Sequence, residues 1–188
     1  GSGDNQDTWT VHGKAHWILD NLIAEGKAVP MIVVMMDGHA QVPRGRDNTA
    51  YFERDLLEDV MPFVEANYRV KAGSKHRAII GLSMGGGQSL TIGLNHADRF
   101  AWVGGFSASV PREENIGDAL ADIGKLNDRL KLLWVACGED DFLLDRNKAF
   151  IELLGEKKVD HEWYLTKGNH SWPVWRGYLE DVLPRLFK

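Results

Sequence analysis

One short segment of the sequence combines residue types that support nucleophilic chemistry. Residues 81–86 read Gly-Leu-Ser-Met-Gly-Gly and contain the pattern Gly-x-Ser-x-Gly. In that pattern a serine lies on a sharp turn between a strand and a helix, with its hydroxyl exposed at the end of the sheet. Such a turn leaves no room for side chains two residues away, which explains glycine at 81 and 85. The sequence therefore predicts Ser83 as a nucleophile.

A phosphate-binding loop is the competing interpretation of the same glycines. That loop would end in Gly-Lys-Ser or Gly-Lys-Thr, and this segment lacks such an ending. The helix predicted after Ser83 directs its free N–H groups and the positive end of its dipole at the hydroxyl. These groups favour a role for Ser83 as a nucleophile, because they can stabilise the negative oxygen, the oxyanion, that forms when a serine attacks a carbonyl group. The backbone N–H of Met84 is predicted as the first hydrogen-bond donor to that oxyanion.

A serine hydroxyl needs a general base, and the sequence offers seven histidines. On open α/β sheets the nucleophile is followed along the chain by an acid and then by the histidine, each after a later strand. His170 follows a late predicted strand, residues 161–165, and lies in a loop that contains Gly168. We therefore predict His170 as the base.

The acid that orients the base is predicted in the turn after residues 131–137. That apolar stretch is followed by Gly-Glu-Asp-Asp at 138–141. Asp141 lies far enough beyond the strand for its carboxylate to turn back over the sheet edge, so we predict Asp141 as the acid. Asp140 is the alternative, and Glu139 is expected to face water or cap the next helix.

The remaining histidines give weaker signals. His12 and His16 have the spacing of a metal pair, but Gly13 stands where His-Glu-x-x-His requires glutamate, and no third ligand is evident. We predict no metal and no organic cofactor. His39 follows Asp37-Gly38 at the end of a predicted strand and is a candidate for the substrate pocket. Three further histidines are predicted at the surface, namely His76, His96 and His161.

Apolar periodicity predicts the elements that position these residues. The predicted strands are 31–36, 77–80, 101–107, 131–137 and 161–165, and the predicted helices are 15–23, 52–63, 84–96, 146–157 and 175–187. Apolar strands that alternate with helices indicate an α/β fold with a mostly parallel sheet covered on both faces. Pro62 predicts a kink or a new start within its helix.

Length and composition exclude several classes of protein. The chain has 188 residues, 44% apolar and 26% charged, which predicts one globular domain over residues 1–188. With a net charge of −5 and no dense basic patch, no nucleic-acid partner is expected. Apolar runs are far shorter than the roughly 20 residues of a membrane span, so no membrane partner is expected.

Cys137 lies in an apolar run and is predicted to be buried and unreactive.

Five segments together resemble the "putative esterase" group of α/β-hydrolases, at residues 35–39, 52–57, 81–86, 137–143 and 168–175. This group contains feruloyl and acetylxylan esterases (carbohydrate esterase family one), enterochelin esterases and mycolyltransferases. The resemblance covers nearly the whole chain from Trp9 onward. It implies an α/β-hydrolase fold with Ser83 as nucleophile, Asp141 as acid and His170 as base.

The resemblance also implies a function. We expect hydrolysis of a carboxylic ester, feruloyl or acetyl, on a carbohydrate such as xylan, through an acyl-enzyme and without a cofactor. Siderophore hydrolysis, acyl transfer, and a binding or inactive truncated form are the alternatives. Members of the group suggest a secreted or periplasmic location. Trp172 and Trp175, close after the base, either wall an acyl or sugar pocket or pack the last helix on the sheet.

The first residues depart from the group. Members of the group begin with two or three strands that have no counterpart in this chain. The last of these strands leads into the loop that binds the oxyanion, and the similarity to this chain starts only there. Gly1-Ser2-Gly3 resembles the start of that loop, so the Ser2 backbone is the candidate second donor. We expect the N-terminal strands to be missing and the slot between strands 31–36 and 77–80 to be empty or filled from another molecule. Oligomers or strand exchange would follow. A short natural variant with an expression scar is the alternative.

Overall fold

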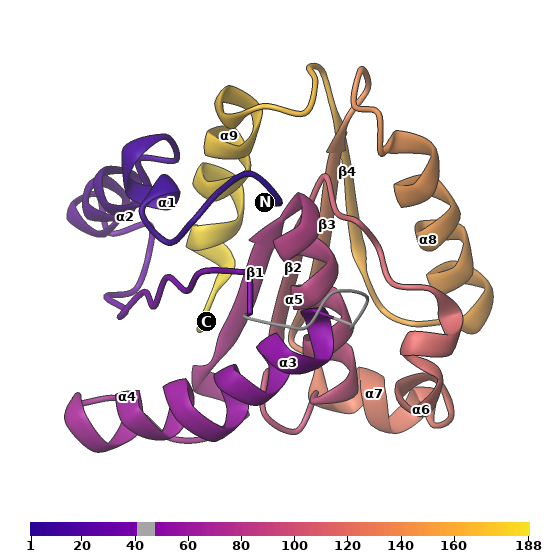
Figure 1. The fold of residues 1–188 in the computed structure, drawn as a ribbon, viewed down its shortest axis with the longest axis horizontal. Coiled ribbons are helices and arrows are strands. Elements are labelled where there is room, and N and C mark those ends of the chain that lie inside the picture. Colours follow the sequence, from indigo (N-terminus) through magenta and orange to yellow (C-terminus); the bar gives the residue numbers. More distant parts are fainter. Residues whose placement is uncertain (41–47) are drawn as a thin grey trace.

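The computed structural model describes residues 1–40 and 48–188. Its sheet has the order β1-β2-β3-β4, and each neighbouring pair is parallel. The strands are β1 (Ala78–Leu82), β2 (Trp102–Phe106), β3 (Leu132–Gly138) and β4 (Glu162–Thr166) (Figure 1). Because the strands are parallel, their carboxyl ends meet at one edge of the sheet, and the loops that follow them lie together. The predicted α/β fold with a parallel sheet is confirmed.

Helices connect and cover the strands. They are α1 (Thr8–Val11), α2 (Ala15–Ala24), α3 (Asn48–Arg54), α4 (Met61–Asn67), α5 (Ser83–Asn95), α6 (Gly117–Leu120), α7 (Ile123–Arg129), α8 (Leu144–Lys157) and α9 (Trp172–Val182). A π-helical segment, Asp55–Val60, joins α3 to α4 without a break in the helical backbone, and Pro62 lies in the first turn of α4. Among the described residues, none of these helices has both the length and the apolar character needed to cross a membrane.

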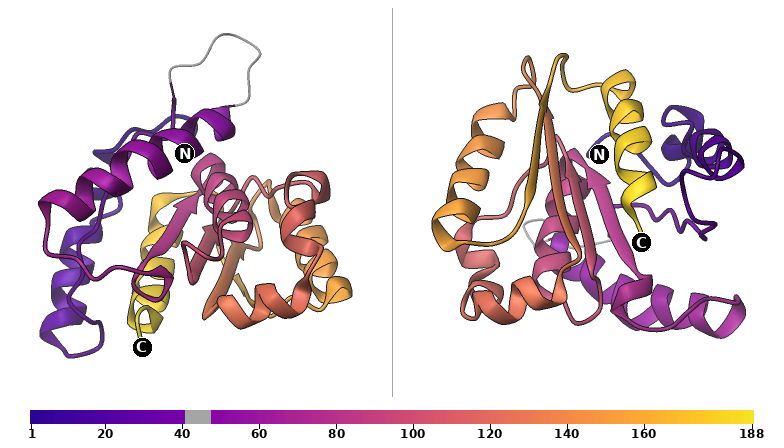
Figure 2. Two further views of the ribbon diagram at one scale, coloured as in Figure 1. Left: turned by 90° about the horizontal axis from the view of Figure 1, so that it is seen from below. Right: turned by 180° about the vertical axis from the view of Figure 1, so that it is seen from behind.

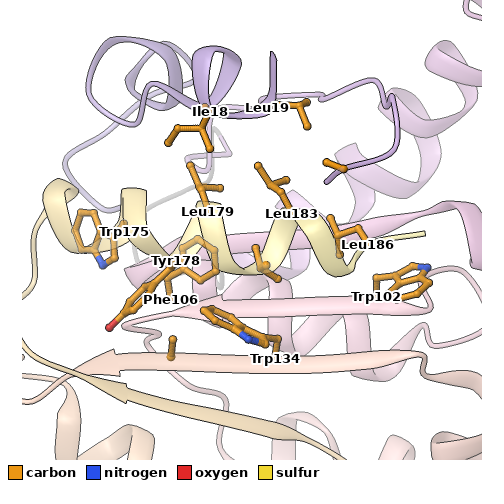
Figure 3. Close-up of a cluster of buried hydrophobic side chains, with 14 of the residues drawn as sticks. Ile18, Leu19, Trp102, Phe106, Trp134, Trp175, Tyr178, Leu179, Leu183 and Leu186 are labelled. Atoms are coloured by element: carbon orange, nitrogen blue, oxygen red, sulfur yellow. The ribbon is translucent and has the colours of Figure 1, made fainter. Parts of the chain in front are cut away.

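The strands have apolar side chains on both faces, and each face has its own helical cover. Along β3, Trp134 belongs to one buried cluster and Leu133 to the other, as expected when successive side chains point to opposite faces. Figure 2 shows α9 and α8 on opposite sides of the sheet. Figure 3 shows α9 between α2 and the sheet, with Leu179 facing Ile18. Burial on both faces therefore fixes the sheet between two helical layers.

Residues 31–36 do not form the predicted strand. They are extended, but the described residues give them no strand partner, and Ile32 and Val34 are 51% and 48% exposed. A cavity of about 350 Å³ separates this segment from β1, and residues of both line it. A β-strand requires a hydrogen-bonded neighbour, so an apolar sequence alone was not sufficient here. Consequently β1 is the edge strand of the described sheet, next to the slot that the sequence analysis expects between residues 31–36 and 77–80.

The open edge of β1 leads to a prediction about assembly. Its residues Ala78–Leu82 carry no charge and no proline, the features that normally protect an edge from pairing with another chain. We expect this chain to form oligomers as its concentration rises. Size-exclusion chromatography with light scattering measures their mass. Val33→Lys, which places a charge on the segment beside this edge, should shift the distribution towards monomer.

Val11 provides the matched control, because it is 55% exposed on α1 and Val33 is 48% exposed. Val11→Lys should leave the association unchanged. A chain that stays monomeric over the whole concentration range would contradict the prediction, as would an equal response to both substitutions.

Candidate active site

Ser83 lies at the junction between β1 and α5, where the backbone is strained. It is the first residue of α5 and has φ of +53°, a left-handed conformation that few non-glycine residues adopt. A Cβ atom at Gly81 would lie 2.2 Å from the carbonyl oxygen of Gly85, so glycine is required at 81. At Gly85 an added Cβ would meet open space, so the expectation of no room there is wrong.

The fold brings the three residues predicted for catalysis into one hydrogen-bonded row. Ser83 Oγ lies 3.0 Å from His170 Nε2. On the other side of the ring, His170 Nδ1 lies 2.9 Å from Asp141 Oδ2 and 3.1 Å from Asp141 Oδ1. The serine follows β1, the aspartate follows β3 and the histidine follows β4. With this geometry the imidazole can accept a proton from the hydroxyl while the carboxylate holds its other nitrogen.

Asp141 rather than Asp140 faces the histidine. The Asp141 side chain is fully buried, and its Oδ1 accepts a hydrogen bond of 2.8 Å from the backbone N–H of Leu143. Asp140 and Glu139 are exposed, and the backbone N–H of Asp140 donates to the Gly168 carbonyl. Adjacent residues of the turn therefore point in different directions, one towards His170 and one towards water.

Two aromatic rings contact His170. Its centroid lies 4.5 Å from that of Phe142 and 4.8 Å from that of Trp175, which is perpendicular to it. Trp175 is buried and donates from Nε1 to Ser107 Oγ at 3.1 Å, and these contacts restrict rotation of its indole ring. The contact between Phe142 and His170 was not predicted from the sequence. The only sequence signal for it is that Phe142 directly follows Asp141.

The tryptophans near the base have mainly packing contacts. Trp172 is half-buried, and its ring lies 5.4 Å from Trp9 and 5.3 Å from Trp175, edge to face in both cases. These contacts connect α9 to α1 and favour the packing alternative over a wall for acyl groups or sugars.

A buried amide that the sequence analysis missed holds the acid loop. Asn147 on α8 is fully buried and donates from Nδ2 to the carbonyls of Ala108 and Leu143, each at 2.9 Å. Its Oδ1 accepts from the Ala108 N–H at 3.3 Å. The loop after β2 is thereby tied to the loop that carries Asp141. Asparagine on an amphipathic helix is common, so no sequence signal distinguished this one.

The start of the chain lies beside the nucleophile turn. A Cβ atom added at Gly1 would lie 3.1 Å from Leu82 Cδ1, which places Gly1 against the residue before Ser83. The carbonyl oxygen of Ser2 is 3.0 Å from His39 Nε2. His39 is exposed, and the structure places it between Ser2 and Asp37.

The other groups considered from the sequence do not form a second site. Among residues 1–40 and 48–188 there is no group of three or more metal-ligating side chains, and this includes the surroundings of His12 and His16. Cys137 is fully buried, and burial raises the pKa of its thiol to about 12. The thiol is therefore protonated near neutral pH, which makes it a poor nucleophile.

Comparisons with known proteins give a family match and several relatives. A family model described as "Putative esterase" matches residues 3–186. An endo-1,4-beta-xylanase/feruloyl esterase of Xylanibacter ruminicola is 34% identical over 193 residues, which cover 100% of this chain. The chain spans only 25% of the length of that relative.

Solved structures with the same fold include two esterases. A ferulic acid esterase is 29% identical, with a TM-score of 0.78 over 96% of this chain and 79% of its own. A CE1 ferulic acid esterase of Anaeromyces mucronatus is 25% identical, with a TM-score of 0.71 over 89% of this chain and 68% of its own. The latter has also been solved in complex with ferulic acid. These matches identify the fold as that of the α/β-hydrolases.

Proposed function

Since this chain belongs to the esterase family, we propose that it is a serine esterase that cleaves feruloyl or acetyl esters on plant cell-wall polysaccharide such as xylan. The observation that carries the proposal is the row formed by Ser83, His170 and Asp141, with 3.0 Å between Ser83 Oγ and His170 Nε2. A hydroxyl in this setting can become a nucleophile without a metal or an organic cofactor.

The proposed reaction proceeds in two halves. Ser83 Oγ attacks the ester carbonyl carbon, and its proton passes to His170 Nε2. The tetrahedral intermediate collapses, the alcohol leaves with the proton from His170, and the acyl group remains on Ser83 as an ester. Water then gives a proton to His170 as it attacks the acyl carbon. The second tetrahedral intermediate collapses, the acid leaves, and His170 returns the proton to Ser83 Oγ. The Asp141 carboxylate stabilises the imidazolium formed in each half.

The oxyanion of each intermediate requires preorganised donors. We assign the backbone N–H of Met84 as the first, because it lies at the N-terminus of α5, where helical N–H groups have no partner in the helix. The backbone N–H of Ser2 is the proposed second donor, supported by the contact of Gly1 with Leu82. Both donors belong to the backbone, so a substitution of their side chains would not remove them.

The proposed substrate class is supported by the relatives and by one surface feature. One relative is named as a feruloyl esterase and another was solved with ferulic acid. Phe142 is 75% exposed while its ring lies 4.5 Å from that of His170. An exposed aromatic side chain beside the base offers a surface for an aromatic acyl group. The alcohol side of the ester is proposed to be a carbohydrate.

A parallel assay tests the substrate class. Methyl ferulate, acetylated xylan and a catecholate siderophore ester are offered to the chain, and a fluorophosphonate probe reports labelling of Ser83, with Ser83→Ala as the control. We expect labelling of the parent only, and kcat/KM for the ferulate or acetyl ester at least about tenfold above that for the siderophore. Labelling with a preference for the siderophore would overturn the substrate class. A parent chain that is not labelled would overturn serine catalysis.

A further inference from the structure

Among the described residues, one imidazole makes the hydrogen bond that joins residues 1–4 to a distant segment of the chain. His39 Nε2 lies 3.0 Å from the Ser2 carbonyl oxygen, and His39 Nδ1 lies 3.1 Å from Asp37 Oδ1. In the described part of the chain, the other hydrogen bonds and the ion pair of residues 1–4 stay inside that segment. Ser2 is therefore held by its hydrogen bond to His39 and by the packing of the neighbouring Gly1 on Leu82.

The segment that carries His39 is itself attached to the nucleophile helix. The Gly38 carbonyl accepts hydrogen bonds from Gln88 Nε2 at 2.9 Å and from Asn48 Nδ2 at 2.8 Å. Gln88 is 2% exposed and belongs to α5, the helix that begins with Ser83. A continuous set of contacts thus runs from α5 through Gly38 and His39 to Ser2.

We propose that His39 is a positioning residue for the oxyanion site. By holding the Ser2 carbonyl it restrains the peptide plane between Ser2 and Gly3. That restraint limits where the adjoining plane, which carries the Ser2 backbone N–H, can lie relative to Ser83. This inference rests on the proposed function, in which that N–H is the second oxyanion donor. The reason is geometric: a donor must be in place before charge develops, and a misplacement of about 1 Å can cost about 10² in rate.

Both ring nitrogens of His39 face oxygen acceptors. One nitrogen faces the Asp37 carboxylate and the other the Ser2 carbonyl, and neither oxygen can donate. The His39 backbone N–H, which donates to Asp37 Oδ1 at 2.9 Å, is the main cause of a lowered pKa of the Asp37 carboxyl, and the hydrogen bond to the His39 side chain also contributes. Asp37 is therefore ionised and anchors the ring.

The test compares two amides that replace different nitrogens of the ring. In His39→Gln the amide nitrogen takes the place of Nε2 and can still donate to the Ser2 carbonyl. In His39→Asn the shorter amide takes the place of Nδ1 and reaches Asp37 only. We expect His39→Asn to lower kcat for an aryl acetate by about 10- to 100-fold with KM nearly unchanged, and His39→Gln to retain most of the kcat. His16→Gln, an exposed histidine on α2, should behave as the parent.

A second measurement does not depend on activity. Hydrogen–deuterium exchange of the peptide that covers residues 1–12 should be faster in His39→Asn than in His39→Gln or the parent, while the melting temperatures of all three stay equal. Equal kcat and equal exchange in the two amide variants would overturn the inference. A parent without ester turnover would overturn the proposed function instead, and the exchange comparison would still decide the role of His39.

Discussion

Substitution of Ser83 or of His170 by alanine is expected to lower kcat by about 10⁶ in each case, a magnitude taken from another hydrolase with the same three residue types. Ser83 Oγ and His170 Nε2 are 3.0 Å apart, and each needs the other, because the hydroxyl cannot attack until its proton is accepted. The measurement is kcat for a chromogenic aryl ester, at substrate concentrations well above KM.

The double variant distinguishes cooperation from independent effects. If Ser83 and His170 act as one unit, the combined substitution should be little worse than either alone. Both side chains are partly exposed, so the melting temperature should change little in either variant. A double variant in which the two losses multiply would contradict the proposed mechanism, and so would a His170→Ala variant that retains most of the activity.

Asp141→Asn is expected to lower kcat by about 10⁴. The carboxylate lies 2.9 Å from His170 Nδ1 and keeps the proton on that nitrogen, which leaves Nε2 free to accept from Ser83. An amide can turn its NH₂ group to Nδ1 and so favour the other tautomer, whose Nε2 carries a proton and cannot act as base. The loss should appear in kcat, measured across pH, with the fold monitored by circular dichroism.

Asp140→Asn is the matched control for Asp141→Asn. It makes the same chemical change one residue away, on a side chain that faces water. We expect its kcat to stay within about twofold of the parent, since a surface substitution without partners changes little. If Asp140→Asn proved damaging and Asp141→Asn mild, the assignment of the acid would be wrong.

The nucleophile turn is an example of what local sequence can determine. Gly81 and Ser83 could be placed on a strand-to-helix turn from the sequence because the constraints act over a few residues. A Cβ at position 81 would meet the backbone of Gly85, and the helix begins at the serine itself. The parallel direction of the strands could also be predicted from the sequence. Apolar strands that alternate with helices have few arrangements that bury both faces of the sheet, and a parallel sheet is the common one.

The burial of Asp141 rather than Asp140 and the contacts of His39 depended on tertiary structure. Asp140 and Asp141 differ in sequence by one position, and only the packing of the loop after β3 against His170 decides which carboxylate is buried. His39 was a candidate pocket residue by its position after a predicted strand, whereas its contact with Ser2 joins residues 37 positions apart. Local patterns carry no information about such pairs.

Residues 31–36 show the same limit in secondary structure. Their composition is that of a buried strand, yet the backbone is extended without strand pairing in the described residues, and a cavity of about 350 Å³ lies between them and β1. Sequence by itself determined that this segment is apolar and extended, as it determined the class of fold, and it predicted Ser83 as the nucleophile and His170 as the base. Tertiary structure decided whether the segment is a strand, because backbone hydrogen bonds in a sheet come from a neighbour that local sequence does not specify.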